Sequence, residues 1–389
     1  MSKTFFFAPL FLGLLASPVF AMAQHPPEHP YVGLRVAVLE NEPSVTLNVK
    51  GSYRLQRLYT QEVIREGERL DETFYPSGSG VVIGKEETGL VGVRLFPLQA
   101  EAVRVNGRRF RGIIDVVRQT EAALLVVNHL DLEEYLYGVL QHEVPHEWPR
   151  QMLEVQAILA RTYALYKKME NVDKEYDLSS TVLSQMYGGR EDEKRRARAA
   201  VNQTLGKVLV YQGTLFPTFY HSTCGGHTED AVAVKFLKAE FSPLTGRECP
   251  YCTASPYYRW QRGFLYSDLA LRLKRAGYEI SDLKEIKTGP EDPSGRVTTL
   301  DLVFRQGNLT VPAIDFRLAV GPSELRSTRF RLENGWERVT FVGGGWGHGV
   351  GLCQWGAYEM AKRGFSVEQI LLFYYPGSEI RELLTIPWN

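Results

Sequence analysis

The first third of the chain is patterned for β-structure. Residues 32–39 form an apolar-rich run, and residues 44–49 alternate between apolar and polar side chains with a period of two. The pair Asn106–Gly107 signals a tight hairpin turn. Residues 124–127, all leucine or valine, are typical of a short buried strand. We therefore expect β-structure from residue 31 to about residue 128.

Beyond residue 148 the spacing of apolar residues changes to that of helices. Pro149 occupies a favoured first-turn position, and apolar side chains recur at helical spacing from Met152 to Tyr166, which predicts a helix ending near Lys168. Further segments are predicted as helices over residues 192–202, 267–277, 355–363 and 367–374, and as strands over residues 296–305 and 328–332. The last helix has the capping-box pair Ser366 and Gln369. Because strands are grouped rather than strictly alternating with helices, the pattern indicates an α+β fold.

Length and composition indicate an ordinary globular protein with more than one core. The chain has 389 residues, of which 44% are hydrophobic and 23% are charged. We divide the mature chain into an N-terminal β-rich region, residues 24–120, and a helix-containing region with the candidate chemistry, residues 121–389. The formal net charge is zero. This balance gives no support to a general nucleic-acid-binding surface.

The N-terminus has the parts of a secretory signal peptide. Lys3 precedes an apolar run from Phe5 to Leu15, and Ala21-Met22-Ala23 forms an A-x-A cleavage site. We interpret residues 1–23 as a signal peptide, with an uncleaved anchor as the alternative. Either way the folded part is exported, to the periplasm or the cell-envelope surface. No other stretch approaches the length of a transmembrane helix, so no span is expected in the mature chain.

Glu143 is the first candidate for chemistry. It lies between apolar turns and close to Pro145. A carboxyl group partly removed from water there would have a raised pKa and hold a proton near neutral pH, as protonation of a glycosidic oxygen requires. From composition alone, a surface or helix-capping glutamate is the commoner interpretation. The flanking His142 and His146 are interpreted as surface or hydrogen-bonded histidines.

Three of the four cysteines cluster with histidines in metal-ligand spacing. Cys224-x-x-His227 is followed by Cys249-x-x-Cys252. Thiolates and imidazoles suit tetrahedral Zn²⁺, and four protein ligands would make the site structural. His221 is an alternative ligand to His227. A disulfide, Cys249–Cys252 or Cys224–Cys249, is the competing interpretation in an oxidising compartment.

A glycine-rich segment, residues 343–351, is the third candidate. Glycines allow a backbone to approach a ligand or another strand closely. No Gly-Lys-Ser/Thr follows, so a phosphate-binding loop is not supported. The nearby aromatic residues are candidates for stacking on sugar rings, with core packing as the alternative; they are Trp346, Trp355, Tyr374 and Tyr375.

Three blocks of the sequence resemble, in order, the hallmark blocks of the SpoIID/LytB family. They read YLYGVLQHEVPHEWP with QAILARTYAL, then FYHSTCGGHTED, then GGWGHGVGLCQWGAYEMAKRGFSVEQILLFYYPG. The resemblance covers about residues 31–380, nearly the whole mature chain. The family includes stage II sporulation protein D, a peptidoglycan lytic transglycosylase, and the amidase-enhancer proteins. It implies an SpoIID-like mixed fold whose catalytic region has a glycan groove.

The resemblance also implies roles for matching residues. The glutamate of the family's G-V-x-x-x-E-x-P block, its catalytic acid and base, falls on Glu143. Residues expected to bind substrate at the glycan groove are Gln156, Arg161, His348, Gln354 and Trp355; for Gln156 and Arg161 the alternative is a supporting position behind the groove. Zinc bound by Cys and His around the H-S-T-x-G-G block is known in part of the family and fits the cysteine cluster. Cys353 departs from the pattern, since serine is usual there, and we give it no catalytic role.

The implied reaction is non-hydrolytic cleavage between N-acetylmuramic acid and N-acetylglucosamine, leaving a 1,6-anhydro end. Two other functions compete with it. One is a non-catalytic glycan-binding module that stimulates a partner cell-wall amidase. The other is a zinc hydrolase acting on stem peptides, which would need an open coordination position that three clustered cysteines argue against.

Overall fold

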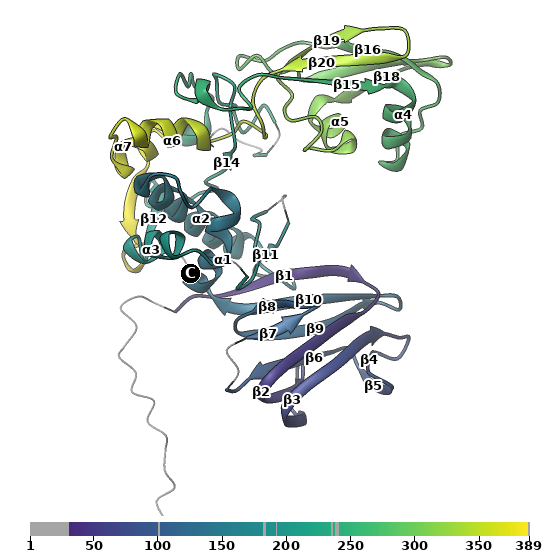
Figure 1. The fold of residues 1–389 in the computed structure, drawn as a ribbon, viewed down its shortest axis with the longest axis vertical. Coiled ribbons are helices and arrows are strands. Elements are labelled where there is room, and N and C mark those ends of the chain that lie inside the picture. Colours follow the sequence, from purple (N-terminus) through teal and green to yellow (C-terminus); the bar gives the residue numbers. More distant parts are fainter. Residues whose placement is uncertain are drawn as a thin grey trace, which may run out of the picture.

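The computed structural model describes residues 31–99, 102–181, 184–191, 193–234, 236–237 and 241–387. Figure 1 shows three parts along the long axis: a large N-terminal sheet, a helical part, and a smaller unit of strands and helices at the far end. Helices and strands are both abundant, which confirms the α+β prediction. The segment interpreted as a signal peptide lies outside the described residues. None of the described helices has the length and apolar character needed to cross a membrane.

The N-terminal part is a single, mostly antiparallel sheet in the order β11-β1-β10-β9-β6-β2-β3-β4-β5, with the β7–β8 hairpin paired to β2. Its strands are β1 (Gly33–Glu42), β2 (Val45–Arg57), β3 (Val63–Pro76), β4 (Val81–Ile83), β5 (Glu86–Leu90), β6 (Gly92–Pro97), β7 (Val103–Val105), β8 (Arg108–Phe110), β9 (Ile113–Thr120), β10 (Ala123–Asp131) and β11 (Leu178–Ser179). The period-two alternation is realised in β2, where Val45, Leu47 and Val49 are buried. The boundary drawn at residue 120 falls at the turn between β9 and β10, inside this sheet.

The helical part surrounds one central helix. Its elements are α1 (Leu132–Glu143), α2 (Arg150–Glu170), α3 (Arg195–Gln203), α6 (Gln354–Lys362) and α7 (Val367–Tyr374), with a small sheet of β12 (Lys207–Tyr211), β13 (Thr214–Leu215) and β22 (Glu379–Glu382). α2 is buried at every position from Met152 to Leu165 except Glu154. The prediction for α2 is confirmed to within two residues, and the capping box of α7 is present. α1 was not predicted as a helix.

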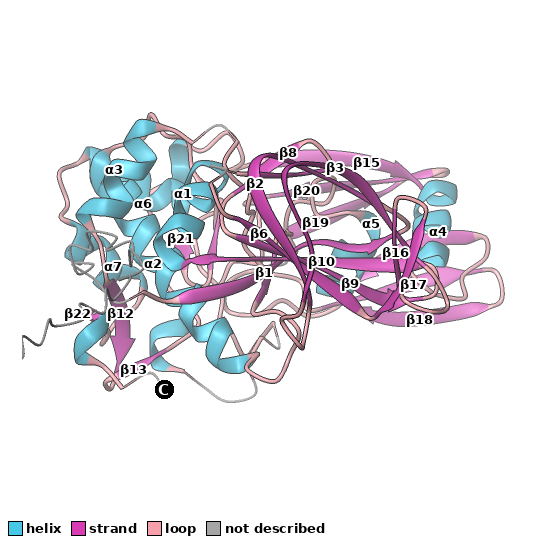
Figure 2. Ribbon diagram, turned by 90° about the horizontal axis from the view of Figure 1, so that it is seen from below, coloured by secondary structure: helices cyan, strands magenta, loops and turns pink. Residues whose placement is uncertain are grey.

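The far unit has a hydrophobic core of its own. It contains β15 (Trp260–Leu265), α4 (Tyr266–Arg275), β16 (Leu283–Thr288), β17 (Thr299–Phe304), β18 (Gly307–Pro312), α5 (Ala313–Val320), β19 (Phe330–Asn334) and β20 (Arg338–Gly343). The chain enters it from the helical part and returns there, so the unit is an insertion. We call it the inserted unit. The sequence pattern had not separated it from the rest of residues 121–389. Figure 2 shows that it and the large sheet extend to the same side of the helices.

Two distant loops meet between the helices and the inserted unit. β14 (Tyr220–His221) pairs in parallel with β21 (Leu352–Cys353), and Thr223 bridges Trp346. This pairing lays the HSTCGG block beside the glycine-rich block. Short 3₁₀ turns lie at Ser242–Leu244, Cys252–Ala254 and Leu383–Thr385.

Candidate active site

Glu143 is the last residue of α1. Val144 precedes Pro145 and adopts an extended conformation, φ −141° and ψ 146°, which ends the helix. A carboxylate at the C-terminal end of a helix meets the negative end of the helix dipole, which disfavours its charge. The local sequence therefore places this carboxyl group where its protonated form is favoured.

The Glu143 side chain is partly buried. Its Oε1 accepts a hydrogen bond from the Met186 backbone N–H at 3.1 Å, and the Tyr220 hydroxyl also hydrogen-bonds to the carboxylate. Burial raises the pKa of Glu143 to about 7, and the two hydrogen bonds oppose that rise because they stabilise the charged form. A carboxyl group with this pKa can both donate and accept a proton at neutral pH.

Buried phenols line the inner side of Glu143. Tyr135 donates a hydrogen bond to Gln185 Oε1 at 3.1 Å, and Gln185 Nε2 donates to the Tyr220 oxygen at 3.2 Å. Burial, then the Glu143 charge, raises the pKa of Tyr135 and Tyr220 well above 10. Both phenols therefore keep their protons. Gln185 was missed by sequence reasoning, since it lies in an irregular segment without a motif.

Two predicted groove residues support the Glu143 backbone. Gln354, the first residue of α6, donates from Nε2 to the Glu143 carbonyl at 3.2 Å and to Gln156 Oε1 at 3.3 Å. Gln156 is fully buried and Gln354 is 7% exposed. These amides therefore fix the position of the end of α1, and burial leaves them little surface for a glycan.

An aromatic group includes the residue after Gln354 in α6. The ring of Trp148 lies 5.3 Å from that of Trp355 and 4.8 Å from that of Tyr358, measured between centroids. All three side chains are only partly buried. Partly exposed aromatic faces are suited to stacking on sugar rings. Trp148 and Tyr358 were not among the predicted groove residues.

Arg161 is not at the groove, and this prediction needs correction. Its guanidinium is fully buried in α2 and makes two hydrogen bonds of 2.7 Å to the carboxylate of Glu133 on α1. It also donates to the Lys207 carbonyl. Arg161 therefore ties α1 and β12 to α2 and reaches no solvent.

Replacing Arg161 with methionine should lower the free energy of unfolding by about 3–5 kcal/mol, because Glu133 is left as a buried, unpaired charge. The double variant Arg161→Met/Glu133→Leu should recover most of that loss. Urea denaturation of the three proteins measures both effects. A glycan-contact role would instead raise KM in a variant of unchanged stability.

His348 lies behind the site among aromatic rings. Its Nδ1 accepts from the Val350 N–H, its ring hydrogen-bonds to the Tyr220 backbone, and it packs 5.6 Å from the His221 ring. Burial, followed by the charge of Arg317, lowers the pKa of His348 to about 3. His348 is therefore neutral, and these contacts position β14 and Tyr220.

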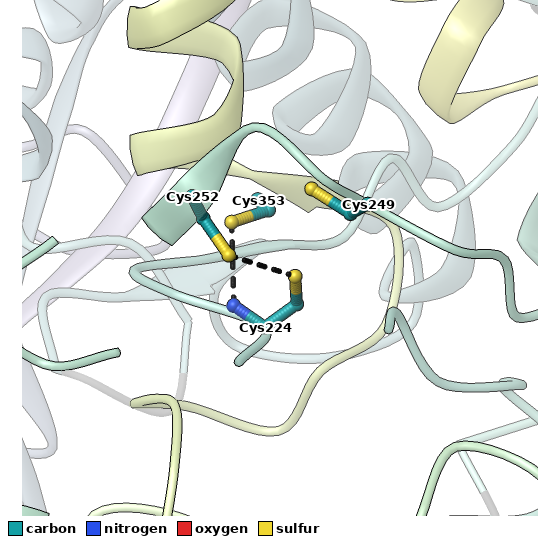
Figure 3. A group of neighbouring side chains, drawn as sticks. All are labelled: Cys224, Cys249, Cys252 and Cys353. Carbon is teal, nitrogen blue, oxygen red and sulfur yellow. Dashed lines mark hydrogen bonds between the residues drawn. The ribbon is translucent and has the colours of Figure 1, made fainter. Parts of the chain in front are cut away.

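The four cysteines converge in one buried group, which we call the thiol cluster: Cys224, Cys249, Cys252 and Cys353. Their sulfur atoms all lie within 4.8 Å of one another, with 3.4 Å between Cys224 and Cys252. Figure 3 shows the four side chains pointing toward a common centre. All four are free thiols, so the structure contains neither of the disulfides considered from the sequence. Hydrogen bonding from Cys224 lowers the pKa of Cys252.

The cluster changes the expected ligand set. Cys353 occupies the place predicted for His227, whose Nδ1 instead lies 2.6 Å from the Thr228 carbonyl oxygen. His221 is not in the cluster either, and its Nδ1 bonds the Val350 carbonyl. Cys353 arrives because β21 pairs with β14, and the Cys224 N–H donates to its sulfur at 3.2 Å. The only signal in the sequence was a cysteine where serine is usual.

The cluster fits a zinc ion. A tetrahedral site with Zn–S bonds of about 2.3 Å places its sulfurs about 3.8 Å apart, within the spread of the four thiols. Four buried thiolates leave no open coordination position. The chemistry of the donor set therefore matches a structural rather than a catalytic metal.

Arg296 connects the inserted unit to the thiol cluster. It is 1% exposed and donates to the Cys224 and His227 carbonyls at 3.1 and 3.2 Å. Its Nε lies 3.9 Å from Glu229, which is also buried. Beside it lies a polar cavity of about 390 Å³, whose lining includes Gly226, His227, Glu248, Cys249, Tyr258, Ser294 and Arg329. Glu143 is not among its lining residues.

Comparison with known proteins links this geometry to a family. A model described as Stage II sporulation protein (SpoIID) matches residues 120–211, which include α1, Glu143 and α2. A domain of unknown function (DUF8618) matches residues 234–351, which include the inserted unit.

Individual relatives extend these matches. An uncharacterized protein of Brachyspira hyodysenteriae is 30% identical over 349 residues, which is 89% of this chain and 92% of the relative. Stage II sporulation protein D of Bacillus subtilis is 28% identical over 66% of this chain and 76% of its own length. The amidase enhancer of Bacillus subtilis is 26% identical over 63% of this chain and 40% of its own length. With Glu143 presented at the end of α1 inside the matched segment, the chain belongs to the SpoIID family.

Proposed function

We propose that this chain is an exported lytic transglycosylase, which cleaves the bond between N-acetylmuramic acid and N-acetylglucosamine in peptidoglycan. Membership of the SpoIID family gives it a cell-wall-related function. The observation that carries the finer proposal is the environment of Glu143, whose pKa burial raises to about 7. The partly exposed Trp148, Trp355 and Tyr358 nearby support a sugar substrate.

One carboxyl group suffices for this reaction. Protonated Glu143 donates its proton to the glycosidic oxygen as that bond breaks. The resulting carboxylate accepts the proton of the C6 hydroxyl of the muramic acid, whose oxygen bonds to the anomeric carbon of the same sugar. No water is consumed, and an intramolecular nucleophile lowers the entropic cost of attack. The hydrogen bonds from Met186 and Tyr220 orient the carboxylate and stabilise its charged form.

The pH dependence of kcat/KM should reflect the Glu143 pKa. Because the free enzyme must carry the proton, kcat/KM should be greatest below about pH 7 and fall about tenfold per pH unit well above it. Rates of glycan release between pH 5.5 and 9 measure this. An alkaline limb near pH 5, as expected for an ordinary glutamate, would contradict the assigned environment.

We further propose that the thiol cluster holds a structural Zn²⁺. Its ligands are the thiolates of Cys224, Cys249, Cys252 and Cys353. When bound, the metal cross-links the loops around β14 and β21 and supplies no chemistry to the glycan. This arrangement disfavours the zinc-hydrolase alternative.

The alternative function is a glycan-binding enhancer of a cell-wall amidase. It is favoured by the relative named as an amidase enhancer. In that case the chain would bind glycan strands at the same surface and recruit a hydrolase.

Product analysis separates these functions. The purified mature chain is incubated with peptidoglycan, intact and stripped of stem peptides, and released sugars are identified by mass spectrometry. A product lighter than the hydrolysis product by one water supports the transglycosylase. A hydrolysed product would support the glycan as substrate, but the nucleophile would then be water rather than the C6 hydroxyl. Binding without any product favours the enhancer.

A further inference from the structure

A segment without regular secondary structure contacts the carboxylate of Glu143. Residues 184–191, which we call the strap, contact α1 and lead toward α3. Met186 in the strap donates its N–H to Glu143. Its neighbour Gln185 is fully buried and bonds Tyr135, Tyr220 and the Ala160 carbonyl. The start of the strap is therefore part of the active site.

The end of the strap is attached to the N-terminal sheet. Arg190 N–H donates to the Arg109 carbonyl on β8 at 2.7 Å. The Arg109 guanidinium makes a bidentate pair with Glu191 at 2.8 and 3.0 Å, and the Arg109 N–H donates to the same carboxylate at 3.0 Å. Bidentate pairs fix both position and orientation.

A second ion pair continues this attachment just past the strap. Arg111 makes a bidentate pair with Glu193, whose side chain is 7% exposed. Hydrogen bonding to Glu193 raises the pKa of Arg111. The two ion pairs therefore join the N-terminal part to the segment that runs from the strap to α3.

Close backbone packing holds the middle of the strap. The Gly188 N–H donates to the Gly138 carbonyl of α1 at 3.2 Å. Gly189 has φ +74°, and a Cβ there would lie 2.4 Å from the Arg109 carbonyl oxygen. Only glycine fits between α1 and β8 at this point. The strap is thus packed between α1 on one side and β8 on the other.

The turn between β7 and β8 sets this geometry. Asn106 and Gly107 both have positive φ, 46° and 84°, as expected for a tight hairpin. The hairpin places Arg108 and Arg109 beside the strap. The Arg108 guanidinium donates to the Tyr187 carbonyl, and Arg109 pairs with Glu191. A turn motif in the N-terminal sheet thereby builds one wall of the support for Glu143.

We propose that Arg109 and Arg111 are positioning residues of the active site, which hold the strap through Glu191 and Glu193 so that the Met186 N–H stays on the Glu143 carboxylate. The N-terminal sheet is then an integral support of the catalytic group rather than a separate binding module. The proposal rests on the proposed function of Glu143 as acid and base.

The expected consequence is a change in proton affinity. The Met186 hydrogen bond stabilises charged Glu143, so a loosened strap should raise the pKa of Glu143 further, by about half to one unit. The alkaline limb of kcat/KM should move upward by the same amount, and kcat should fall several-fold because the carboxylate is less well oriented.

The test uses Glu191→Gln, Arg111→Gln and the charge-exchanged double variant Arg109→Glu/Glu191→Arg in the full mature chain. Arg109 and Glu191 are 43% and 35% exposed, so neither change should unfold the protein. Arg69→Gln serves as the matched control, since Arg69 is exposed on β3 and pairs with Asp71. The readouts are the pH profile of glycan cleavage and the titration of Glu143 by carboxyl NMR, assigned by its loss in Glu143→Gln.

Glu191→Gln should shift both readouts upward, and Arg69→Gln should leave them unchanged. The double variant should restore them in part, because it regains the ion pair but not the bond that the residue 109 N–H donates to Glu191. The proposal would be overturned if the pKa of Glu143 in both Glu191→Gln and Arg111→Gln equalled that in the wild-type protein. If the wild-type chain cleaves no glycan but the NMR shift and its rescue are seen, the proposed function fails while the positioning role stands.

Discussion

Glu143→Gln is expected to lower glycan cleavage by about 10²–10⁴-fold, the usual contribution of a positioned general acid and base, while glycan binding persists. The amide is nearly isosteric with the carboxyl group but cannot donate a proton to the leaving oxygen. Released anhydro product and co-sedimentation with peptidoglycan measure the two effects. Glu147→Gln is the matched control, because Glu147 lies four residues away with a side chain 68% exposed. Retained cleavage in Glu143→Gln would remove the assignment.

The same variant should also change stability in a pH-dependent way. Burial raises the pKa of Glu143 from its ordinary 4.5 to about 7, so the folded state binds this proton more tightly than the unfolded chain. Wild-type stability should therefore fall as pH rises from about 4.5 to about 7, by up to about 3 kcal/mol from this group. Glutamine lacks that titration. Relative to wild type, Glu143→Gln should gain stability above pH 7 and lose the gain near pH 4.

A catalytic group that destabilises its own protein is a signature of function rather than of packing. Denaturation of both proteins at pH 4.5 and pH 8 gives the difference directly. Equal stability differences at the two pH values would mean that Glu143 ionises as a solvated glutamate does. The control Glu147→Gln should show no pH-dependent difference.

Loss of one thiol from the cluster should have the largest effect on stability. Cys353→Ser is expected to remove bound zinc and lower the free energy of unfolding by more than about 4 kcal/mol, because structural zinc sites contribute folding energy directly. Serine is close in size, so the effect separates the thiolate from the volume of the side chain. Metal content by mass spectrometry and thermal unfolding with and without a chelator measure it.

The thiol cluster is also linked to the catalytic group through a single residue, Gln354. Cys353 immediately precedes Gln354, which donates to the Glu143 carbonyl. Cys353→Ser should therefore lower cleavage as well as stability, through displacement of Gln354. His227→Ala is the matched control, because His227 lies outside the cluster. Purified protein that lacks zinc and retains four reactive thiols at full stability would contradict the metal assignment, and zinc loss in His227→Ala would restore the ligand set expected from the sequence.

Local sequence patterns determined the elements whose stability is local. The helical spacing from Met152 to Tyr166 predicted α2, and the Ser366–Gln369 pair predicted the start of α7, because both depend on contacts within one or two turns. Asn106–Gly107 predicted its turn for the same reason. Glu143 could be singled out because it matches the glutamate of the family's G-V-x-x-x-E-x-P block, whereas its neighbours alone favoured an ordinary surface or helix-capping glutamate.

Tertiary structure decided everything that depends on distant pairing. Cys353 joins Cys224 across 129 positions only because β21 pairs with β14. Arg161 resembles a groove residue in sequence, yet it is buried against Glu133 because α1 packs on α2. The strap has no motif, and its hold on Glu143 arises from ion pairs to a strand about eighty positions earlier. Such contacts depend on how whole elements pack together. The spacing of residues within one segment does not determine that packing.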